Sequence, residues 1–220
     1  MKRPLFTMVF FFMLCPAALA QMTHYYESRH QDTGALSERS LISIRSDADG
    51  KRYVHFEKGY PDYTQTEDYV FGPQYETLSG RILNKNERTD YTIMRQGTSA
   101  VITGTLEGKE INRQLGLGND PLFLFPKFNL AGFVLSDKKM ITFWSLRNDT
   151  LEEYKMIAKR EGVENIIISG KPTTAAKVYL TTANPLFRIF KRTYYFRLND
   201  GLFLKQEYAD GRVRELVKEE

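Results

Sequence analysis

Short segments of alternating polar and apolar residues, separated by turn residues, run through the sequence from about residue 25 and constrain its fold most strongly. A period of two places successive side chains on opposite faces of a sheet. Two late turns contain Asp200-Gly201 and Asp210-Gly211, and Asp-Gly between alternating segments is a strong hairpin signal. Short, evenly spaced strands are typical of antiparallel meanders. The sequence therefore predicts an all-β fold, a curved, mostly antiparallel meander sheet or open barrel with a short helical plug.

The same pattern predicts where the strands lie. Segment 151–159 also fits a short helix, but strand is favoured because the expected turn at Glu161-Gly162 leads directly into another apolar segment. The predicted strands are 25–29, 36–45, 52–57, 69–71, 75–83, 89–95, 100–106, 110–115, 140–146, 151–159, 163–169, 175–182, 193–198, 202–208 and 213–217. No linker divides them, so we expect residues 21–220 to form a single β-rich domain.

The run 121–136 interrupts this pattern, because it is strongly apolar and Lys127 is its only charged residue. Asp120 can cap a helical turn, and Pro121 suits the first helical position, where no N–H is needed. Pro126 is expected to break that turn, because proline lacks a donor and clashes with the preceding turn. The sequence thus predicts two short, broken helical turns that either complete the core or line an apolar cavity.

Aromatic residues in and just after this run are the candidate ligand-binding residues. Their apolar surface is too large to leave in water, so a concave surface must receive it or be covered by it. One interpretation makes the run the lining or lid of an apolar ligand cavity, and the other makes it a plug of the core. The candidates are Phe123, Phe125, Phe128, Phe133 and Trp144.

The first twenty residues resemble a cleaved secretory signal peptide. Lys2 and Arg3 precede a short apolar segment, and Ala18-Leu19-Ala20 fits a cleavage site before Gln21. The apolar segment is too short to span a bilayer as a stable helix. A retained membrane anchor and a lipoprotein modified at Cys15 are the alternatives. We expect residues 1–20 to be removed and the protein to be periplasmic.

Charge and cysteine content bear on the partners of the protein and on whether it contains a disulfide. Without residues 1–20 the chain has 29 Lys and Arg against 27 Asp and Glu, a net charge of +2, so bulk charge gives no case for a nucleic-acid partner. The single cysteine, Cys15, would leave with the signal peptide, so no disulfide is expected. A cysteine-free chain of this length can bury enough core to fold without one.

Motifs for catalysis or metal binding are missing from the sequence. The three histidines, His24, His30 and His55, have no metal-site spacing, and the first two are expected to be solvated or capping. There is no Gly-x-Ser-x-Gly elbow. Acidic pairs such as Glu67-Asp68 would point to opposite faces of a strand. We therefore expect no enzyme, no cofactor and no metal; a cleft that gathered His55, an acid and a serine would favour an enzyme instead.

Basic and aromatic residues alternate over 187–197. This pattern fits a contact with a membrane surface, where amphipathic rings lie at the interface and cations meet anionic headgroups. It also fits a strand with one aromatic face and one solvated basic face.

Several segments, including 129–136, Ile141-Thr142-Phe143-Trp144 and Tyr194-Tyr195-Phe196-Arg197, resemble uncharacterised exported bacterial proteins of a domain-of-unknown-function type. The resemblance covers about residues 22–210. Such proteins are similar in architecture to the periplasmic lipoprotein carriers, in which short helices cover an open, curved β-barrel. The carriers hold acyl chains in an apolar concavity, so the resemblance implies a similar concavity here and no particular site residue.

Together these features predict a non-enzymatic periplasmic protein that binds a hydrophobic or amphiphilic envelope ligand such as lipid. The alternative is a structural or protein-interaction component of the cell envelope, which would use sheet edges or the segment 187–197.

Overall fold

The computed structural model describes residues 21–59, 64–184 and 191–220. The expected signal peptide and part of the segment 187–197 lie outside these residues. Over the described residues, no helix combines the length and apolar character that crossing a bilayer requires. The described elements are β1 (Gln21–His30), β2 (Leu36–Ser46), β3 (Arg52–Lys58), β4 (Gln65–Phe71), β5 (Thr77–Asn84), β6 (Thr89–Gln96), β7 (Ser99–Leu106), β8 (Lys109–Gly116), α1 (Pro126–Val134), β9 (Met140–Leu146), β10 (Glu153–Ile168), β11 (Lys171–Thr182), β12 (Arg192–Arg197), β13 (Phe203–Tyr208) and β14 (Arg212–Glu219).

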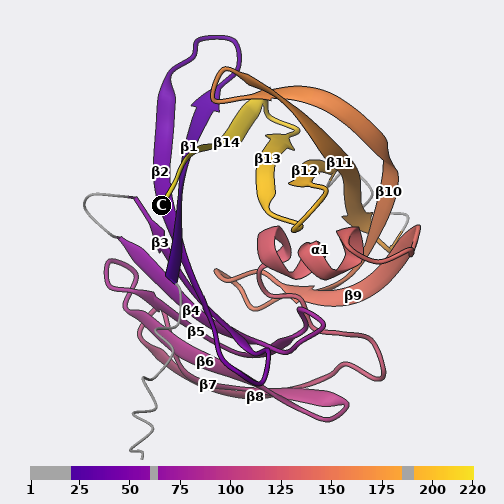
Figure 1. The fold of residues 1–220 in the computed structure, drawn as a ribbon. Helices are drawn as coiled ribbons and strands as arrows, with labels where there is room; N and C mark the ends of the chain where they lie inside the picture. Colours follow the sequence, from indigo (N-terminus) through magenta and orange to yellow (C-terminus); the bar gives the residue numbers. More distant parts are fainter. Residues whose placement is uncertain (1–20, 60–63, 185–190) are drawn as a thin grey trace, which may run out of the picture.

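All fourteen described strands belong to one antiparallel sheet in the order β8-β7-β6-β5-β4-β3-β2-β1-β14-β13-β12-β11-β10-β9. The chain meanders outward from β1 to one edge at β8, then crosses to the opposite edge at β9 and meanders back until β14 pairs with β1. The sheet curls around α1, which lies on its concave side (Figure 1). The predicted curved, antiparallel all-β fold with a short helix is confirmed.

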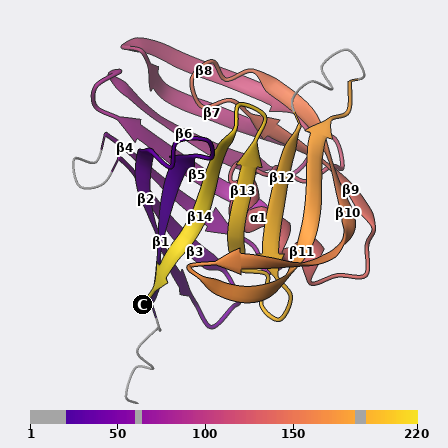
Figure 2. The same cartoon turned by 90° about the horizontal axis from the view of Figure 1, so that it is seen from above.

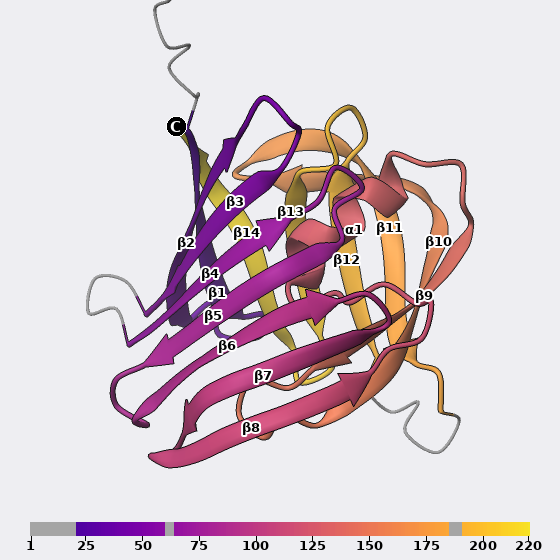
Figure 3. The ribbon, with the colours of Figure 1, turned by 90° about the horizontal axis from the view of Figure 1, so that it is seen from below.

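Two further views place the helix inside the curl. From above, α1 lies behind β12 and β13 (Figure 2), and from below it lies behind the end of β5 (Figure 3). Gly201, in the turn between β12 and β13, meets the helix closely, because a Cβ added there would lie 2.9 Å from the Cβ of Ala131. Glycine at this position lets the turn and the helix approach, and its φ of 70° also favours glycine.

The two edge strands approach each other without pairing, so the sheet is not closed into a barrel. Side chains and one loop bridge the opening instead. Trp144 Nε1 donates to the carbonyl of Leu117 at 2.8 Å, and Arg113 of β8 donates to the carbonyl of Leu151 at 3.0 Å. The loop before α1 covers the free edge of β9, because Phe123 N donates to Trp144 O at 2.8 Å and Trp144 N donates to Pro121 O at 2.9 Å. Covering an edge in this way prevents its pairing with another chain.

The prediction of two broken helical turns is wrong. Residues 121–123 pair with the edge of β9, where Leu122 forms a parallel bridge with Trp144. Asp120 accepts a hydrogen bond from Thr142 instead of capping a helix. Pro126 begins the helix at a position where its missing N–H costs nothing, so α1 is one uninterrupted helix. Its last turn is capped by Arg160 of β10, whose Nη2 donates to the carbonyls of Phe133, Val134 and Ser136 at 2.6–2.7 Å.

The predicted turn at Glu161-Gly162 is also wrong, although the choice of strand over helix for 151–159 is correct. β10 continues through this point as a single strand, and its register with β11 shifts between Arg160 and Gly162. The shift is a β-bulge, which Gly162 permits with a φ of 147°. Bulges re-aim neighbouring side chains, and this one lies beside the Arg160 that caps α1.

Candidate functional site

The five predicted ligand-binding residues do not gather around one cavity. Phe125 and Phe128 point into the space that the curled sheet encloses. The ring centroid of Phe125 lies 5.1 Å from that of Phe56, and the ring centroid of Phe128 lies 4.6 Å from that of Phe71. Phe123 and Phe133 face a separate groove at the far end of the helix.

The other three predicted residues, Phe123, Phe133 and Trp144, serve mainly to pack against neighbouring side chains. Phe123 lies 4.5 Å from the ring of Phe143, and the Arg160 guanidinium lies 5.6 Å from the Phe133 ring. The indole N–H of Trp144 donates the hydrogen bond to Leu117 that crosses the sheet opening. The ammonium of Lys155 lies over the face of the same indole ring. Of the predicted set, Phe125 and Phe128 are therefore the two that face space inside the sheet.

A cavity of about 570 Å³ lies inside one end of the curl, beside the start of α1. Apolar side chains form one part of its wall: Phe56, Ile82, Leu124, Phe125 and Leu146. Six cationic and four acidic residues share the rest of the wall with neutral polar groups. Ligand cavities are commonly about 300–1,000 Å³ and combine an apolar wall with a few placed polar groups. The interior is thus partly hollow and more polar than the Phe-rich run predicts.

A row of polar side chains crosses the inner face of the sheet at this cavity. Register places Glu38 beside Ser28, Ser28 beside Arg214, Arg214 beside Gln206, and Gln206 beside Tyr194, on five adjacent strands. Four members of this row are buried: Ser28, Arg214, Gln206 and Tyr194. A sheet face that only packed a core would place apolar residues along such a row.

The charged members of this row are linked to each other. Arg214, 6% exposed, donates through Nε to Ser28 Oγ at 2.9 Å and forms an ion pair with Glu38. Lys58 lies 3.6 Å from the same Glu38, so one carboxylate serves two cations. Gln206 is 1% exposed, and its Oε1 accepts no hydrogen bond from the described residues. A buried amide oxygen without a partner is costly unless a ligand or water satisfies it.

Lys127 extends from the first turn of α1 into the same cavity. Its ammonium lies 5.0 Å from the ring centroid of Phe56 and 5.3 Å from that of Phe125. Among the described residues no carboxylate lies within ion-pair distance of it. Burial, and then the nearby Arg214 guanidinium, hold the pKa of Lys127 well below its usual range. The signal for this residue was present in the sequence, as the one charge in the apolar run.

Glu67 is the deepest acid of the cavity, at 5% exposure. It accepts hydrogen bonds from the hydroxyl of Tyr69 at 2.5 Å, from Gln65 at 2.5 Å and from Asn148 at 3.0 Å. Three neutral donors therefore satisfy this carboxylate without drawing Lys127 into an ion pair. Its strand neighbour Asp68 lies on the outer face, as the sequence predicted for adjacent acids.

A second, smaller cavity of about 140 Å³ shares Phe125 and Lys127 with the first. Its wall includes Phe128 and His24. The prediction that His24 is solvated or capping is wrong, because the residue is 4% exposed and its Nδ1 has no partner among the described residues. Burial lowers the pKa of His24, although Glu219 opposes the shift. His24 in the smaller cavity and Lys127 at the boundary of both cavities thus flank the helix start, and burial lowers the pKa of each.

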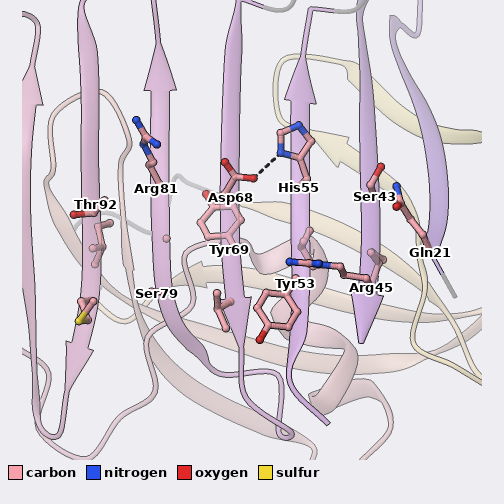
Figure 4. Close-up of a pocket in the computed structure, with 16 residues that line it drawn as sticks. Gln21, Ser43, Arg45, Tyr53, His55, Asp68, Tyr69, Ser79, Arg81 and Thr92 are labelled. Carbon is pink, nitrogen blue, oxygen red and sulfur yellow. Dashed lines mark hydrogen bonds and ion pairs between the residues drawn. The ribbon is translucent and has the colours of Figure 1, made fainter. Parts of the chain in front are cut away.

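Outside the sheet, a groove of about 620 Å³ gathers a serine, a histidine and an acid (Figure 4). Ser43, His55 and Asp68 stand opposite one another on β2, β3 and β4. However, His55 Nδ1 bonds Asp68 at 2.6 Å and Nε2 bonds Glu57 at 2.8 Å. Both ring nitrogens are occupied by carboxylates, so neither is placed to take a proton from Ser43.

The two carboxylates set the titration of His55. Partial burial lowers its pKa, but hydrogen bonds and attraction to Asp68 and Glu57 outweigh burial and leave the pKa above 6.5. The stability gained from protonated His55 is therefore fully present below pH 6.5 and is lost as pH rises through the folded-state pKa. We expect Asp68→Asn to lower the His55 pKa, measured by NMR titration of the ring proton, with exposed His30 as the internal reference. An unchanged His55 pKa would contradict this pairing.

The described residues contain no group of three or more His, Cys, Asp or Glu side chains arranged to hold a metal ion. The described part of the basic-aromatic segment forms β12, where Tyr194, Tyr195 and Phe196 are all buried. Its aromatic rings are thus packed, and residues 187–190 lie outside the described part of the chain.

Comparison with solved structures connects this fold to known ones. The chain is similar to a beta-barrel-like protein of domain of unknown function DUF1849 from Brucella abortus, with a TM-score of 0.62 and 12% identity over 92% of this chain and 98% of that chain. This likeness confirms, at the level of fold, the expected resemblance to a domain-of-unknown-function protein.

Two further structures match less well. The hypothetical lipoprotein YmcC from Escherichia coli gives a TM-score of 0.40 at 11% identity, covering 91% of this chain and 85% of that chain. A DUF1329 family protein from Desulfovibrio piger gives a TM-score of 0.29 at 10% identity, covering 92% and 86%. No protein-family model and no curated protein matches the sequence.

Proposed function

We propose that this protein is a non-enzymatic periplasmic binding protein for an amphiphilic envelope ligand such as lipid, held in the interior cavity. The observation that carries this proposal is the space of about 570 Å³ that α1 leaves unfilled inside the sheet. A wall with both aromatic rings and charged groups suits a molecule with an apolar part and a polar head. The periplasmic location rests on the signal-peptide pattern of residues 1–20.

Binding of 11-(dansylamino)undecanoic acid, a fluorescent amphiphile, tests the proposal. We expect saturable binding with one site per chain, and a bound molecule in native mass spectra of protein purified from the periplasm. Ser145→Trp would place an indole in the cavity from β9 and should weaken binding about tenfold or more, because the ring occupies the ligand's space.

Thr92→Trp is the matched control, because Thr92 is exposed on the outer groove. It should leave the affinity unchanged. Loss of binding in Thr92→Trp alone would place the ligand on the outer face and contradict the interior site. Absence of saturable binding by the wild-type protein, both to this acid and to its methyl ester, would overturn the proposed function itself.

A further inference from the structure

Lys127 is placed where a lysine is unfavourable unless something else neutralises it. It lies in the first turn of α1, where the helix dipole already presents positive charge and no acidic residue is present. Its ammonium contacts two aromatic rings inside the curl. Lys127 is half-buried, and a cation that is partly withdrawn from water normally has an anionic partner. Within the described parts of the chain, Lys127 has none.

The charges that face Lys127 from the surrounding strands do not supply that partner. Arg214 and Arg192 add positive charge, while Glu38 and Glu67 add negative charge. Glu38 is already shared by Arg214 and Lys58, and Glu67 is held by three neutral donors. Both nearby carboxylates are thus already bound by other groups. The positive charge around Lys127 exceeds the negative charge that these two carboxylates supply.

A second unsatisfied group belongs to a residue in the wall of the same cavity. Gln206 lies on the inner face between Arg214 and Tyr194, is 99% buried and leaves Oε1 without a partner among the described residues. A polar ligand group that reached this wall would give the amide a hydrogen bond. An unpaired cation and an unpaired amide on one cavity wall both indicate a polar ligand head, and the cation determines its charge.

We propose that the cavity binds the anionic head of an amphiphile, a carboxylate or a phosphate, against the Lys127 ammonium, with the apolar part of the ligand on Phe56, Phe125 and Leu124. This inference rests on the proposed function and names the class of ligand for the same cavity. Arg214 and Gln206 form the neighbouring polar wall.

A matched pair of probes isolates the charge of the head. 11-(Dansylamino)undecanoic acid and its methyl ester differ in that charge and share the same apolar part. The acid should bind the wild-type protein about 10- to 100-fold more tightly than the ester, the usual range for a charge-assisted hydrogen bond. Lys127→Met should abolish most of this difference by weakening binding of the acid, and Lys127→Arg should retain it.

Lys205→Met is the control, because Lys205 lies on the outer face of β13 beside Glu207. It should bind both probes as the wild type does. Circular dichroism and thermal melts will establish that each variant is folded. A measurement on the wild type needs no substitution: the NMR pKa of the Lys127 ammonium should rise when the acid binds and stay unchanged with the ester.

The outcomes separate this inference from the proposed function. Equal binding of acid and ester, with no effect of Lys127→Met and no rise in the Lys127 pKa, would overturn the anionic head while leaving amphiphile binding intact. Binding of neither probe would overturn both. Binding of inorganic phosphate at Lys127 with affinity equal to that of the acid would identify a free anion as the ligand and overturn the amphiphile.

Discussion

Replacing Phe125 with alanine is expected to lower the free energy of unfolding by about 3 kcal/mol, the lower end of the range for a buried phenylalanine. The ring is 4% exposed and packs against Phe56 and Tyr69, with centroids 5.1 and 5.4 Å away. The loss should fall at the lower end because Phe125 also borders both interior cavities, so part of its surface has no packing partner to lose. Urea unfolding followed by circular dichroism measures the change.

The matched control is Leu135→Ala, in the same apolar run. Leu135 is 45% exposed, so its truncation should change the free energy of unfolding by about 0.5 kcal/mol or less. The comparison separates the two roles considered for residues 121–136. A structural plug loses stability when Phe125 is truncated, whereas a detachable lid would keep its stability and lose only bound ligand. Equal stability of Phe125→Ala and Leu135→Ala would refute the plug.

Strand positions were predictable because their information is local. β9 was predicted from residue 140 to 146 and lies there, because charged and polar residues border this short, largely apolar segment at both ends. β10 was split in two because Glu161-Gly162 has the composition of a turn. Whether such a pair turns or bulges is decided by the strand that pairs with it, and β11 continues opposite both halves of β10. The pairing of β10 with β11 is a contact between strands, and the local composition around Glu161-Gly162 does not predict it.

The helix was misplaced for a related reason. Asp120 and Pro121 are competent to start a helix, and so is Pro126. Hydrogen bonds of the loop to Trp144 on β9 fix residues 121–123 in an extended conformation and leave Pro126 as the start. Local propensity was compatible with a helix that begins at either site, and the hydrogen bonds to β9 determine which of the two is used.

The polar cavity could not be assembled from the sequence, because its members are far apart in the chain. Ser28 and Arg214 are 186 residues apart and become neighbours only because the first and last strands pair. The Phe-rich run indicated the right region, and Phe125 does face the cavity. Its apolar character, however, gave no indication of the cations opposite.

Asn129→Ala is expected to destabilise the protein by about 3 kcal/mol, because it leaves buried backbone groups unpaired at about 1–3 kcal/mol each. Asn129 is fully buried in the second turn of α1. Its Oδ1 accepts from Phe125 N at 2.9 Å, and its Nδ2 donates to Tyr75 O at 2.5 Å and to Thr77 Oγ1 at 3.1 Å. One side chain thus fastens the helix start to the segment that leads into β5.

Chemical denaturation gives the stability of Asn129→Ala, and hydrogen exchange shows where it is lost. Exchange should accelerate at Phe125 N, which loses its acceptor, before it does in the strands. Asn112→Ala is the control, because Asn112 is exposed on the edge strand β8 and its loss should be within about 0.5 kcal/mol. Unchanged exchange at Phe125 would contradict the anchoring role.

The same variant connects the stability of α1 to the proposed ligand site. Lys127 lies one residue after Pro126 and two before Asn129, so the anchor that fixes the helix start also fixes the direction of the ammonium. Loosening that anchor should weaken binding of the dansylated acid more than binding of its ester, because only the acid depends on where the charge lies. Equal loss for the two probes would mean that Asn129 shapes the cavity wall without positioning Lys127.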